Sequence, residues 1–293
     1  MRKNLSITIS TLIVALAALS ACASGPASAK PTAAAAPSAK VAKTRTIVTK
    51  VPVLVKETSF YSDGLVDGYV VYKLDAGNKA LIEKDKYDAS RSEPVERQSF
   101  EYKDGREVAE SVYESDGKLR SRRELEYDSA GRVVSERMLD AKGAALSSSA
   151  YAYDAKGRKA EWKALDASGA AKAVTAYVYG PDGLASIEMR DSAGKLTGTI
   201  KSEYAGGKLA RRVYAGPDGE AQKTESYSYS GSRPSALETK RSDGSIEAKL
   251  AYEYGASGEL VKETEYLPSG SVSSYTTYEY VVREDSSTET YYE

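Results

Sequence analysis

The sequence predicts an all-β fold: a repetitive antiparallel β-meander with two strands in each repeat of 25 or 26 residues. Three observations predict it. A tyrosine recurs at a nearly fixed interval, turn residues punctuate the chain about midway between these tyrosines, and side chains alternate in character between the turns. Alternation is typical of strands, and a repeat of roughly 20–50 residues is typical of architectures that stack one unit many times.

The period is carried by pairs of residues separated by one position, the second of which is a tyrosine. We call the first members leading residues and the second members trailing tyrosines. The trailing tyrosines follow one another at 25 or 26 residues over seven consecutive steps, which indicates one supersecondary unit written repeatedly. The pairs are Phe100 and Tyr102, Leu125 and Tyr127, Tyr151 and Tyr153, Tyr177 and Tyr179, Ser202 and Tyr204, Tyr227 and Tyr229, Tyr252 and Tyr254, and Tyr278 and Tyr280.

Each unit carries two turn signals, 12 or 13 residues apart, as at Asp128-x-x-Gly131 and Asp140-x-x-Gly143. An Asp side chain accepts hydrogen bonds from the backbone N–H groups of a turn, and Gly supplies the positive φ that closes it. An Asp-x-x-Gly loop fits a short hairpin with a bulge, and an Asp-Gly pair fits a type I′ hairpin. We therefore expect φ > 0 at Gly131 and Gly157. Calcium binding is the alternative role for these Asp residues, but many units replace Asp by Ser or Gly, which favours turns.

Alternation favours strands over helices between the turns. At residues 150–153 and 176–179, tyrosines alternate with small residues, and residues 260–266 concentrate charge on one face. Residues 156–163 are rich in Ala and Lys and have helical propensity, but the turn spacing leaves room only for strands of about eight residues.

We expect the repeat domain to occupy residues 45–283, with a first strand region at 45–60 and a longer loop at 88–94, where the spacing is broken. Residues 284–293 are interpreted as a polar tail, with a last edge strand as the alternative. Counting turns gives about 16–19 strands. Because each repeat touches mainly its neighbours, we expect an elongated or spiralling sheet. The sequence leaves open whether that sheet stays open, coils or closes on itself.

Two units match a known repeat most closely: Tyr127-Asp128-Ser129-Ala130-Gly131-Arg132 and Tyr153-Asp154-Ala155-Lys156-Gly157-Arg158. They resemble the YD repeats of Rhs proteins and teneurins, and the resemblance covers roughly residues 95–283. It implies a long antiparallel sheet that spirals into a hollow shell around a toxin. This chain has too few repeats for a large shell and shows no evident toxin region after them. We therefore carry over the sheet and not the toxin biology.

The first residues have the features of an export signal. Arg2 and Lys3 precede an apolar run at residues 5–19, which is shorter than the ~20 residues of a membrane span. Leu19-Ser20-Ala21-Cys22 resembles the lipobox of bacterial lipoproteins. An ordinary secretory signal with an incidental cysteine is the alternative.

The lipobox resemblance implies a signal peptide at residues 1–21, cleavage before Cys22, and acylation of Cys22 with palmitate-type chains. Residues 22–44 then form a flexible linker rich in Ala, Pro, Ser and Lys. Ala23, in place of Asp, implies sorting to the outer membrane if the host has two membranes.

The composition excludes several classes of function. The chain has no histidine and one cysteine, so it has no Ser-His-Asp or Cys-His catalysis and no internal disulfide. The net charge of −1 gives no indication of nucleic-acid binding. No nucleophile elbow, P-loop, metal-ligand cluster or dinucleotide-binding glycine pattern is present, so we name no catalytic residue, metal ligand or cofactor.

The sequence thus favours a membrane-anchored, exported lipoprotein acting as a non-enzymatic β-repeat scaffold or binding module. Its expected partners are the membrane, through the lipid, and a glycan or an envelope or surface protein. The alternative is a glycan- or peptidoglycan-binding protein that stacks sugars on exposed tyrosines. The candidate rings are Tyr151, Tyr153, Tyr177, Tyr179, Tyr227, Tyr229, Tyr252 and Tyr254.

Two further interpretations compete with these. The trailing tyrosines, including Tyr127 and Tyr204, are also explained as cross-strand packing of the sheet, and this reading is favoured. A carboxylate-dependent glycosidase is the least favoured function, because 42 Asp and Glu residues make a close carboxylate pair unspecific.

Trp162, the only tryptophan, lies on an expected strand, and we assign it to packing.

Overall fold

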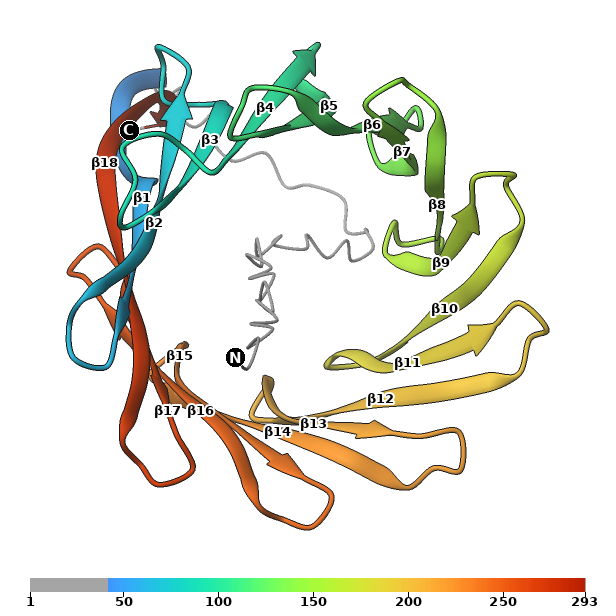
Figure 1. The fold of residues 1–293 in the computed structure, drawn as a ribbon. Coiled ribbons are helices and arrows are strands. Elements are labelled where there is room, and N and C mark those ends of the chain that lie inside the picture. The colour runs from blue at the N-terminus through green and yellow to red at the C-terminus, as the bar shows by residue number, and fades with distance from the viewer. Residues whose placement is uncertain (1–41, 293) are drawn as a thin grey trace, which may run out of the picture. The chain divides into compact units, whose positions relative to one another are not determined.

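The computed structural model describes residues 42–292, and these form 18 strands and no helix. The all-β antiparallel meander and its strand number are as predicted. Figure 1 shows the strands following one another around a ring. Their bounds are β1 Ala42–Tyr61, β2 Val66–Leu74, β3 Leu81–Asp88, β4 Glu96–Lys103, β5 Arg106–Glu114, β6 Leu119–Tyr127, β7 Val133–Asp140, β8 Ala145–Tyr153, β9 Lys159–Asp166, β10 Ala171–Gly180, β11 Gly183–Asp191, β12 Leu196–Ala205, β13 Lys208–Ala215, β14 Ala221–Ser230, β15 Arg233–Arg241, β16 Ile246–Tyr254, β17 Leu260–Tyr266 and β18 Val272–Tyr292.

Each strand pairs antiparallel with the next strand in the sequence, from β1–β2 to β17–β18. β1 also pairs with β18, so the sheet closes on itself. The rings of Phe60 and Tyr275 stack across this junction with centroids 4.7 Å apart. The junction also holds a hydroxyl pair, Ser59 with Thr276 at 3.4 Å.

Closure replaces the elongated or spiralling sheet expected from the sequence. The right-handed twist of successive strands curls a long sheet, and pairing the first strand with the last removes two exposed edges. An even number of antiparallel strands also lets β1 and β18 meet in opposite directions. Contacts divide the chain into a unit of residues 46–288, which contains these junction contacts, and a unit of Met1–Arg45 with Glu289–Glu293. In the second unit, Arg45 pairs with Glu289 at 2.6 Å.

The boundaries of the repeat domain differ from the expected ones at both ends. β1 already begins at Ala42, within the expected linker, and β18 continues through the expected polar tail to Tyr292. β1 and β18 continue beyond the expected bounds because each supplies the other with a pairing strand. Polar side chains are tolerated there because this part of the strand pair is exposed to solvent. The longer loop appears at residues 89–95, between β3 and β4. The signal peptide, Cys22 and the linker up to residue 41 lie outside the described residues.

The turns have the predicted chemistry. Gly131 and Gly157 have φ of 81° and 77°. In the first of these turns, Asp128 Oδ1 accepts the backbone N–H of Arg132 at 2.9 Å, and Gly131 N–H donates to the Asp128 carbonyl at 2.9 Å. A register shift between Glu126 and Tyr127 supplies the expected bulge.

The Asp-Gly pairs divide into two kinds of turn. Asp104 and Gly105 have φ of 52° and 73°, as a type I′ hairpin requires. At Asp243-Gly244, by contrast, Gly244 N–H donates to the carbonyl of Arg241, so this pair sits in the longer bulged loop. The dipeptide alone therefore did not determine the turn type.

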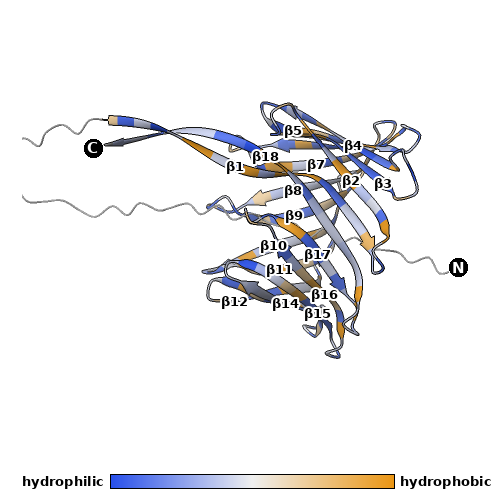
Figure 2. Ribbon diagram, turned by 90° about the vertical axis from the view of Figure 1, so that its left-hand side faces the viewer, coloured by the Kyte–Doolittle hydropathy of each residue, from blue (hydrophilic) through white to orange (hydrophobic). Residues whose placement is uncertain are grey.

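This single-layer sheet buries few apolar side chains. Among residues 42–292, the buried apolar side chains are Ala109, Leu139 and Leu237, and most strand residues are half-buried. Figure 2 shows polar and apolar residues intermixed along the strands. No helix that is long and apolar enough to span a membrane occurs in residues 42–292.

Removal of one two-strand unit tests the repeat. Deleting residues 154–179 joins Tyr153 to Gly180 and leaves 16 strands, so β1 and β18 still meet antiparallel. Deleting residues 154–166 leaves 17 strands and would force β1 and β18 to run parallel. We expect the 26-residue deletion to fold with a modest loss of stability and the 13-residue deletion to lose protease resistance and cooperative melting. Equal folding of the two variants would contradict the two-strand unit.

The turn glycines give a second prediction. Gly131→Ala and Gly157→Ala each force a side chain into the left-handed region, and we expect each to lower the free energy of unfolding by about 1–2 kcal/mol. The two losses should be similar, because the Arg106 Nη2 that a Cβ at position 131 would meet at 2.8 Å is the end of a flexible side chain and can move aside. Gly180→Ala is the control, since its Cβ makes only an ordinary 3.5 Å contact with Ala185. Urea denaturation measures all three, and a Gly180→Ala loss equal to the others would refute the assignment.

Candidate functional site

The most regular side-chain arrangement is a contact between successive turns that we call the turn clasp. Arg132 Nε donates to Asp128 Oδ2 at 2.8 Å, and its guanidinium carbon lies 4.6 Å from the centre of the Tyr153 ring. The Tyr153 hydroxyl in turn donates to the carbonyl of Val133 at 2.6 Å. The backbone N–H and the guanidinium of Arg132 hold the pKa of Asp128 below its usual value. One turn therefore fixes an arginine that covers the trailing tyrosine of the next unit.

The clasp recurs along the sheet. Arg158 is bound by Asp154 at 2.7 Å and lies 4.1 Å from the ring centre of Tyr179, whose hydroxyl donates to Lys159 O at 3.0 Å. In three other units, whose turns lack the Asp-x-x-Gly-Arg sequence, a basic side chain also lies over the ring. These pairs are Arg106 with Tyr127, Lys208 with Tyr229, and Arg233 with Tyr254.

The trailing tyrosines predicted as ligand platforms are thus engaged within the protein. Tyr153, Tyr179, Tyr229 and Tyr254 each lie under a basic side chain. A sugar that stacked on the same ring face would have to displace that cation. These contacts favour the packing interpretation of the trailing tyrosines.

The leading tyrosines face cross-strand partners. Tyr151 lies opposite Trp162, and Tyr177 lies opposite Ile187. Burial raises the pKa of Tyr151 to about 12, and it also raises the pKa of Tyr177. Trp162 is therefore a packing partner in the sheet, as the sequence predicts.

Tyr227 belongs to a hydrogen-bonded network on the same sheet. It lies opposite Leu237. Glu225 Oε2 accepts from the hydroxyls of Tyr214 and Tyr227, each at 2.8 Å, and Lys223 Nζ lies 3.1 Å from Glu225. Burial acts to raise the pKa of Glu225, but these hydrogen bonds outweigh it and the pKa is lowered.

Tyr252 is different, because its cross-strand partner is Glu263. It belongs to a group at the junction of the closed sheet that we call the seam cluster: Glu57, Tyr72, Tyr252, Glu263 and Tyr278. The Tyr72 hydroxyl donates to Glu57 Oε1 at 2.7 Å. Burial, with the charges of Glu265 and Glu57 nearby, raises the pKa of Glu263.

The tyrosines of the seam cluster also have raised pKa values. Burial is the main cause for Tyr252 and Tyr278, and the charge of Glu263 adds to it. In such an arrangement the tyrosine rings can stack on an uncharged ring of a ligand. The neighbouring carboxylates can accept hydrogen bonds from the ligand's hydroxyl groups. The sequence missed this grouping, because Glu57 and Tyr72 precede the regular repeats and reach β16–β18 only through closure.

A further polar group surrounds Asp85, whose side chain is fully buried. Lys73 Nζ and Arg97 Nε each donate to it at 2.8 Å, and Arg97 also lies 3.4 Å from Glu83. Burial acts to raise the pKa of Asp85, but the hydrogen bonds from Arg97 and Lys73 lower it. No sequence signal marked Asp85, apart from its place just before the broken spacing at residues 89–95.

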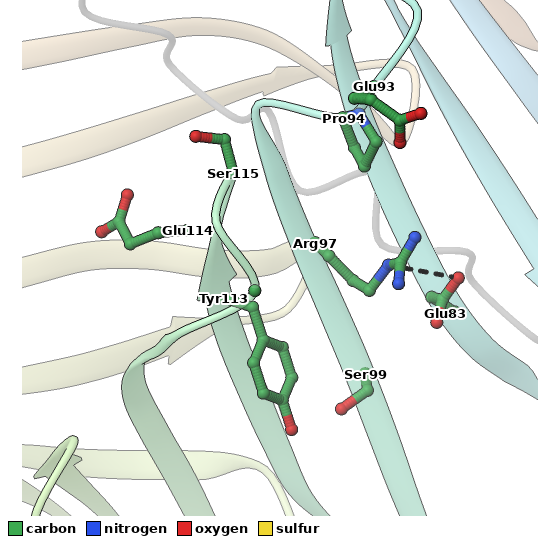
Figure 3. A pocket seen from close by; sticks show the side chains of 9 residues that line it. Glu83, Glu93, Pro94, Arg97, Ser99, Tyr113, Glu114 and Ser115 are labelled. Carbon is green, nitrogen blue, oxygen red and sulfur yellow. Dashed lines mark ion pairs between the residues drawn. The ribbon is translucent and has the colours of Figure 1, made fainter.

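Arg97 borders a cavity of about 370 Å³ beneath the irregular loop. Figure 3 shows Arg97 directed toward Glu83, while the side chain of Glu114 points away from Arg97. The carboxylates that line this cavity therefore do not converge on one point. In residues 42–292, no group of three or more Asp, Glu or Cys side chains is arranged to hold a metal ion.

No protein-family model matches the chain, and no curated protein matches it. Among solved structures, a chain of the Photorhabdus luminescens Tc holotoxin pore is similar, with 14% identity and a TM-score of 0.34 over 71% of this chain and 12% of that chain. A complex named TcdB2-TccC3-Cdc42 gives 14% identity and a TM-score of 0.33 over 78% of this chain and 15% of that chain. A porin-like protein from Bacteroides uniformis gives 12% identity and a TM-score of 0.43 over 78% of this chain and 98% of that chain.

The match thus spans less than a fifth of each toxin chain. At these identities the similarity concerns the fold alone, and TM-scores below 0.5 support no argument about family or function. The likeness to YD repeats therefore rests on the sequence motifs and on their hairpin geometry.

The turn clasp can be tested by a double-mutant cycle. We expect Arg132→Ala and Tyr153→Leu to be coupled by about 0.5–1 kcal/mol, because the guanidinium stacks on the ring. Lys142→Ala, in the neighbouring turn, is the matched control and should show no coupling with Tyr153→Leu. The free energy of unfolding in urea measures each variant. Coupling of the same size in both cycles would show that the stack contributes nothing specific.

Asp85 gives a prediction about pH. Asp85→Asn leaves Lys73 and Arg97 without their shared carboxylate, so we expect a loss of about 1–3 kcal/mol at pH 7. Because the folded pKa of Asp85 is depressed, its contribution is present above its unfolded pKa of 3.8 and is lost as pH falls through the folded value. The difference between wild type and Asp85→Asn should therefore shrink below about pH 4.

The exposed turn residue Asp116 is the control for this measurement. Asp116→Asn should change stability little at pH 7, since its side chain is 52% exposed. Urea denaturation at pH 7 and pH 3 compares the three proteins. An Asp85→Asn deficit that stays constant between these pH values would contradict the assigned ion cluster.

Proposed function

We propose that this chain is an exported lipoprotein that is held on a membrane by a lipid at Cys22 and acts as a non-enzymatic β-repeat scaffold or binding module. The observation that carries the proposal is the turn clasp. The residues that the repeat preserves most regularly are used to join one hairpin to the next. A repeat built this way supplies surface for interaction rather than a reaction centre.

The cavity beside Arg97 supports the non-enzymatic part of the proposal. Its best-placed charged group, Arg97, is bound to Asp85 and Glu83. Glycoside hydrolysis by carboxylates needs two carboxyl groups that flank the same bond. Glu114 is turned away from the rest of the cavity (Figure 3).

Metabolic labelling tests the anchor. The full chain is expressed in a bacterium with two membranes and grown with labelled palmitate. We expect the wild type to be labelled and to sediment with outer membranes, Cys22→Ser to lose both properties, and the neighbouring control Ser24→Ala to keep them. Undiminished labelling of Cys22→Ser would refute the lipoprotein proposal. Protease added to intact cells then distinguishes a surface role from a role inside the envelope.

The seam cluster favours a second candidate, glycan or peptidoglycan binding. Among the described residues, no basic side chain lies over the rings of Tyr252 and Tyr278, although Lys84 lies 5.6 Å from the ring centre of Tyr72. Arg132 and Arg158, by contrast, lie over the trailing tyrosines Tyr153 and Tyr179. Binding to a glycan array and to peptidoglycan should fall at least tenfold in Tyr252→Ala. Tyr177→Ala, a leading tyrosine outside the cluster, should retain binding. Absence of binding by the wild type would refute this candidate and leave the scaffold proposal standing.

A further inference from the structure

The last trailing tyrosine, Tyr280, differs from the others in the side chain that the preceding turn presents to it. In the turn clasp a basic residue precedes its tyrosine by 21 positions, as Arg132 precedes Tyr153. Glu259 holds this position before Tyr280, so the charge of the clasp is reversed there. The basic residues at this spacing are Arg106, Arg132, Arg158, Lys208 and Arg233, over Tyr127, Tyr153, Tyr179, Tyr229 and Tyr254.

Glu259 is the only acidic residue at this position among the eight units. The two other units without a basic residue have the neutral residues Leu81 and Gly183 there, before Tyr102 and Tyr204. A carboxylate is the least suitable replacement for the cation, because the face of an aromatic ring is itself electron-rich. Packing of the tyrosine therefore does not explain why this unit has a glutamate.

Tyr280 is nevertheless placed like its counterparts. Its hydroxyl donates to the carbonyl of Leu260 at 2.7 Å, as the Tyr153 hydroxyl donates to the carbonyl of Val133 at 2.6 Å. Leu260 directly follows Glu259, so the turn and the ring stand in the same relation as in a complete clasp. Within the described residues, no basic side chain lies over the Tyr280 ring. The unit thus has the turn and the ring of a clasp but lacks the cation.

The carboxylate of Glu259 has no partner of its own. It folds back over its own turn, where a Cβ at Gly255 would collide with it. Gly255 stands four residues before Glu259, as Asp128 stands four residues before Arg132, so this turn has no side chain to bind the group. Among residues 42–292, Glu259 Oε2 is one of the few buried side-chain oxygen or nitrogen atoms without a hydrogen-bond partner. Burying a carboxylate oxygen without a donor is costly, and such a group indicates a missing partner.

The surroundings of Tyr280 add further negative charge. Burial raises the pKa of Tyr280, and the charges of Glu259 and Glu57 raise it further. Glu57 accepts a hydrogen bond from the Tyr72 hydroxyl. Neither Glu259 nor Glu57 forms an ion pair within the described part of the chain. A cation beside Tyr280 would therefore be attracted by two carboxylates.

The basic side chains of the neighbouring strands are engaged elsewhere. Arg233, from the preceding turn, lies beside Gly258 and forms no ion pair with Glu259 among the described residues. The other contacts of these basic residues are Arg233 with the Tyr254 ring at 5.6 Å, Lys84 with the Tyr72 ring at 5.6 Å, Lys262 with the Tyr275 ring at 4.9 Å, and Lys56 with Glu279 at 3.1 Å. The place over Tyr280 is thus left to a group from outside the chain.

We propose that Glu259, Tyr280 and Glu57 form a binding site for an organic cation, a guanidinium or ammonium group that takes the place of the missing clasp residue. The cation pairs with Glu259, as Arg132 pairs with Asp128, and lies over the Tyr280 ring. An organic cation suits this site better than a metal ion, because one ring and one or two carboxylates supply too few oxygen ligands. The site goes beyond the proposed scaffold and is independent of the lipid anchor and of glycan binding.

Titration calorimetry of the full chain tests the site. Every protein carries Cys22→Ser, so that the result does not depend on the anchor. The probes are N-acetylarginine amide, a short uncharged peptide with one central arginine, and the same peptide with citrulline, which has nearly the same shape without the charge. We expect the arginine probes to bind and the citrulline peptide to bind about tenfold more weakly or less, because a charge-assisted hydrogen bond is lost.

Glu259→Gln should weaken binding of the arginine probes by a similar factor. Glu253→Gln is the matched control and should retain binding, since Glu253 is 62% exposed and lies 3.6 Å from Lys262. Binding of the peptide alone would assign the site to a basic side chain of a partner protein, and equal binding of the amide would assign it to a small cation. Absence of arginine binding, equal binding of citrulline, or an effect of Glu253→Gln as large as that of Glu259→Gln would overturn the proposal.

Restoring the clasp gives a readout that does not depend on loss of folding. Glu259→Arg supplies the missing cation from within the chain, so we expect the midpoint of urea unfolding to rise and binding of the arginine probes to be lost. Ser257→Arg adds the same charge to an exposed position of the same turn and should leave the midpoint unchanged. A Glu259→Arg protein that is no more stable than Ser257→Arg, or that still binds the probes, would overturn the proposal.

Discussion

Closure of the sheet is the constraint on which the rest of this structure depends. A one-layer sheet has no second layer to bury an apolar face, and few of its side chains are fully buried. Its backbone groups are satisfied only by neighbouring strands, so a free edge would leave a row of donors and acceptors exposed. Pairing of β18 with β1 supplies the missing neighbour along the body of the sheet. Only where these two strands extend beyond β2 and β17 do unpaired edges remain.

The repeat divides its tyrosines between two tasks. Most trailing tyrosines lie at bulged strand ends. Several of them, including Tyr153 and Tyr179, lie under the basic residue of the preceding turn and so join adjacent hairpins. Leading tyrosines lie further into the strands, opposite residues such as Trp162 and Ile187. The aromatic content is therefore mainly packing material of a thin sheet. In the seam cluster, Tyr252 and Tyr278 lie beside Glu263, and Lys84 lies 5.6 Å from the ring centre of Tyr72.

This division shapes the proposed function. In the proposed function the regular units act as the scaffold, and the features that distinguish one place from another occur where the period fails. The Asp85 ion cluster and its cavity lie beside the irregular loop at residues 89–95, and the seam cluster lies where the first strands meet the last. Specific recognition is expected at such irregular places, because identical repeats present the same surface many times.

The sequence by itself determined the local structure of this protein. The spacing of Tyr, Asp and Gly specified strands, hairpins and the positive φ of Gly131, because a turn is made by atoms within five residues of one another. The ion pair of Asp128 and Arg132 is also local, since both residues belong to one loop, but the sequence analysis did not predict it. Only the tertiary structure decided that Arg132 covers Tyr153, that Asp85 is buried between Lys73 and Arg97, and that the sheet closes. Closure joins Ser59 to Thr276, 217 residues apart, and depends on twist accumulated over all 18 strands. No single repeat contains this accumulated twist, so no sequence motif could predict that the sheet closes.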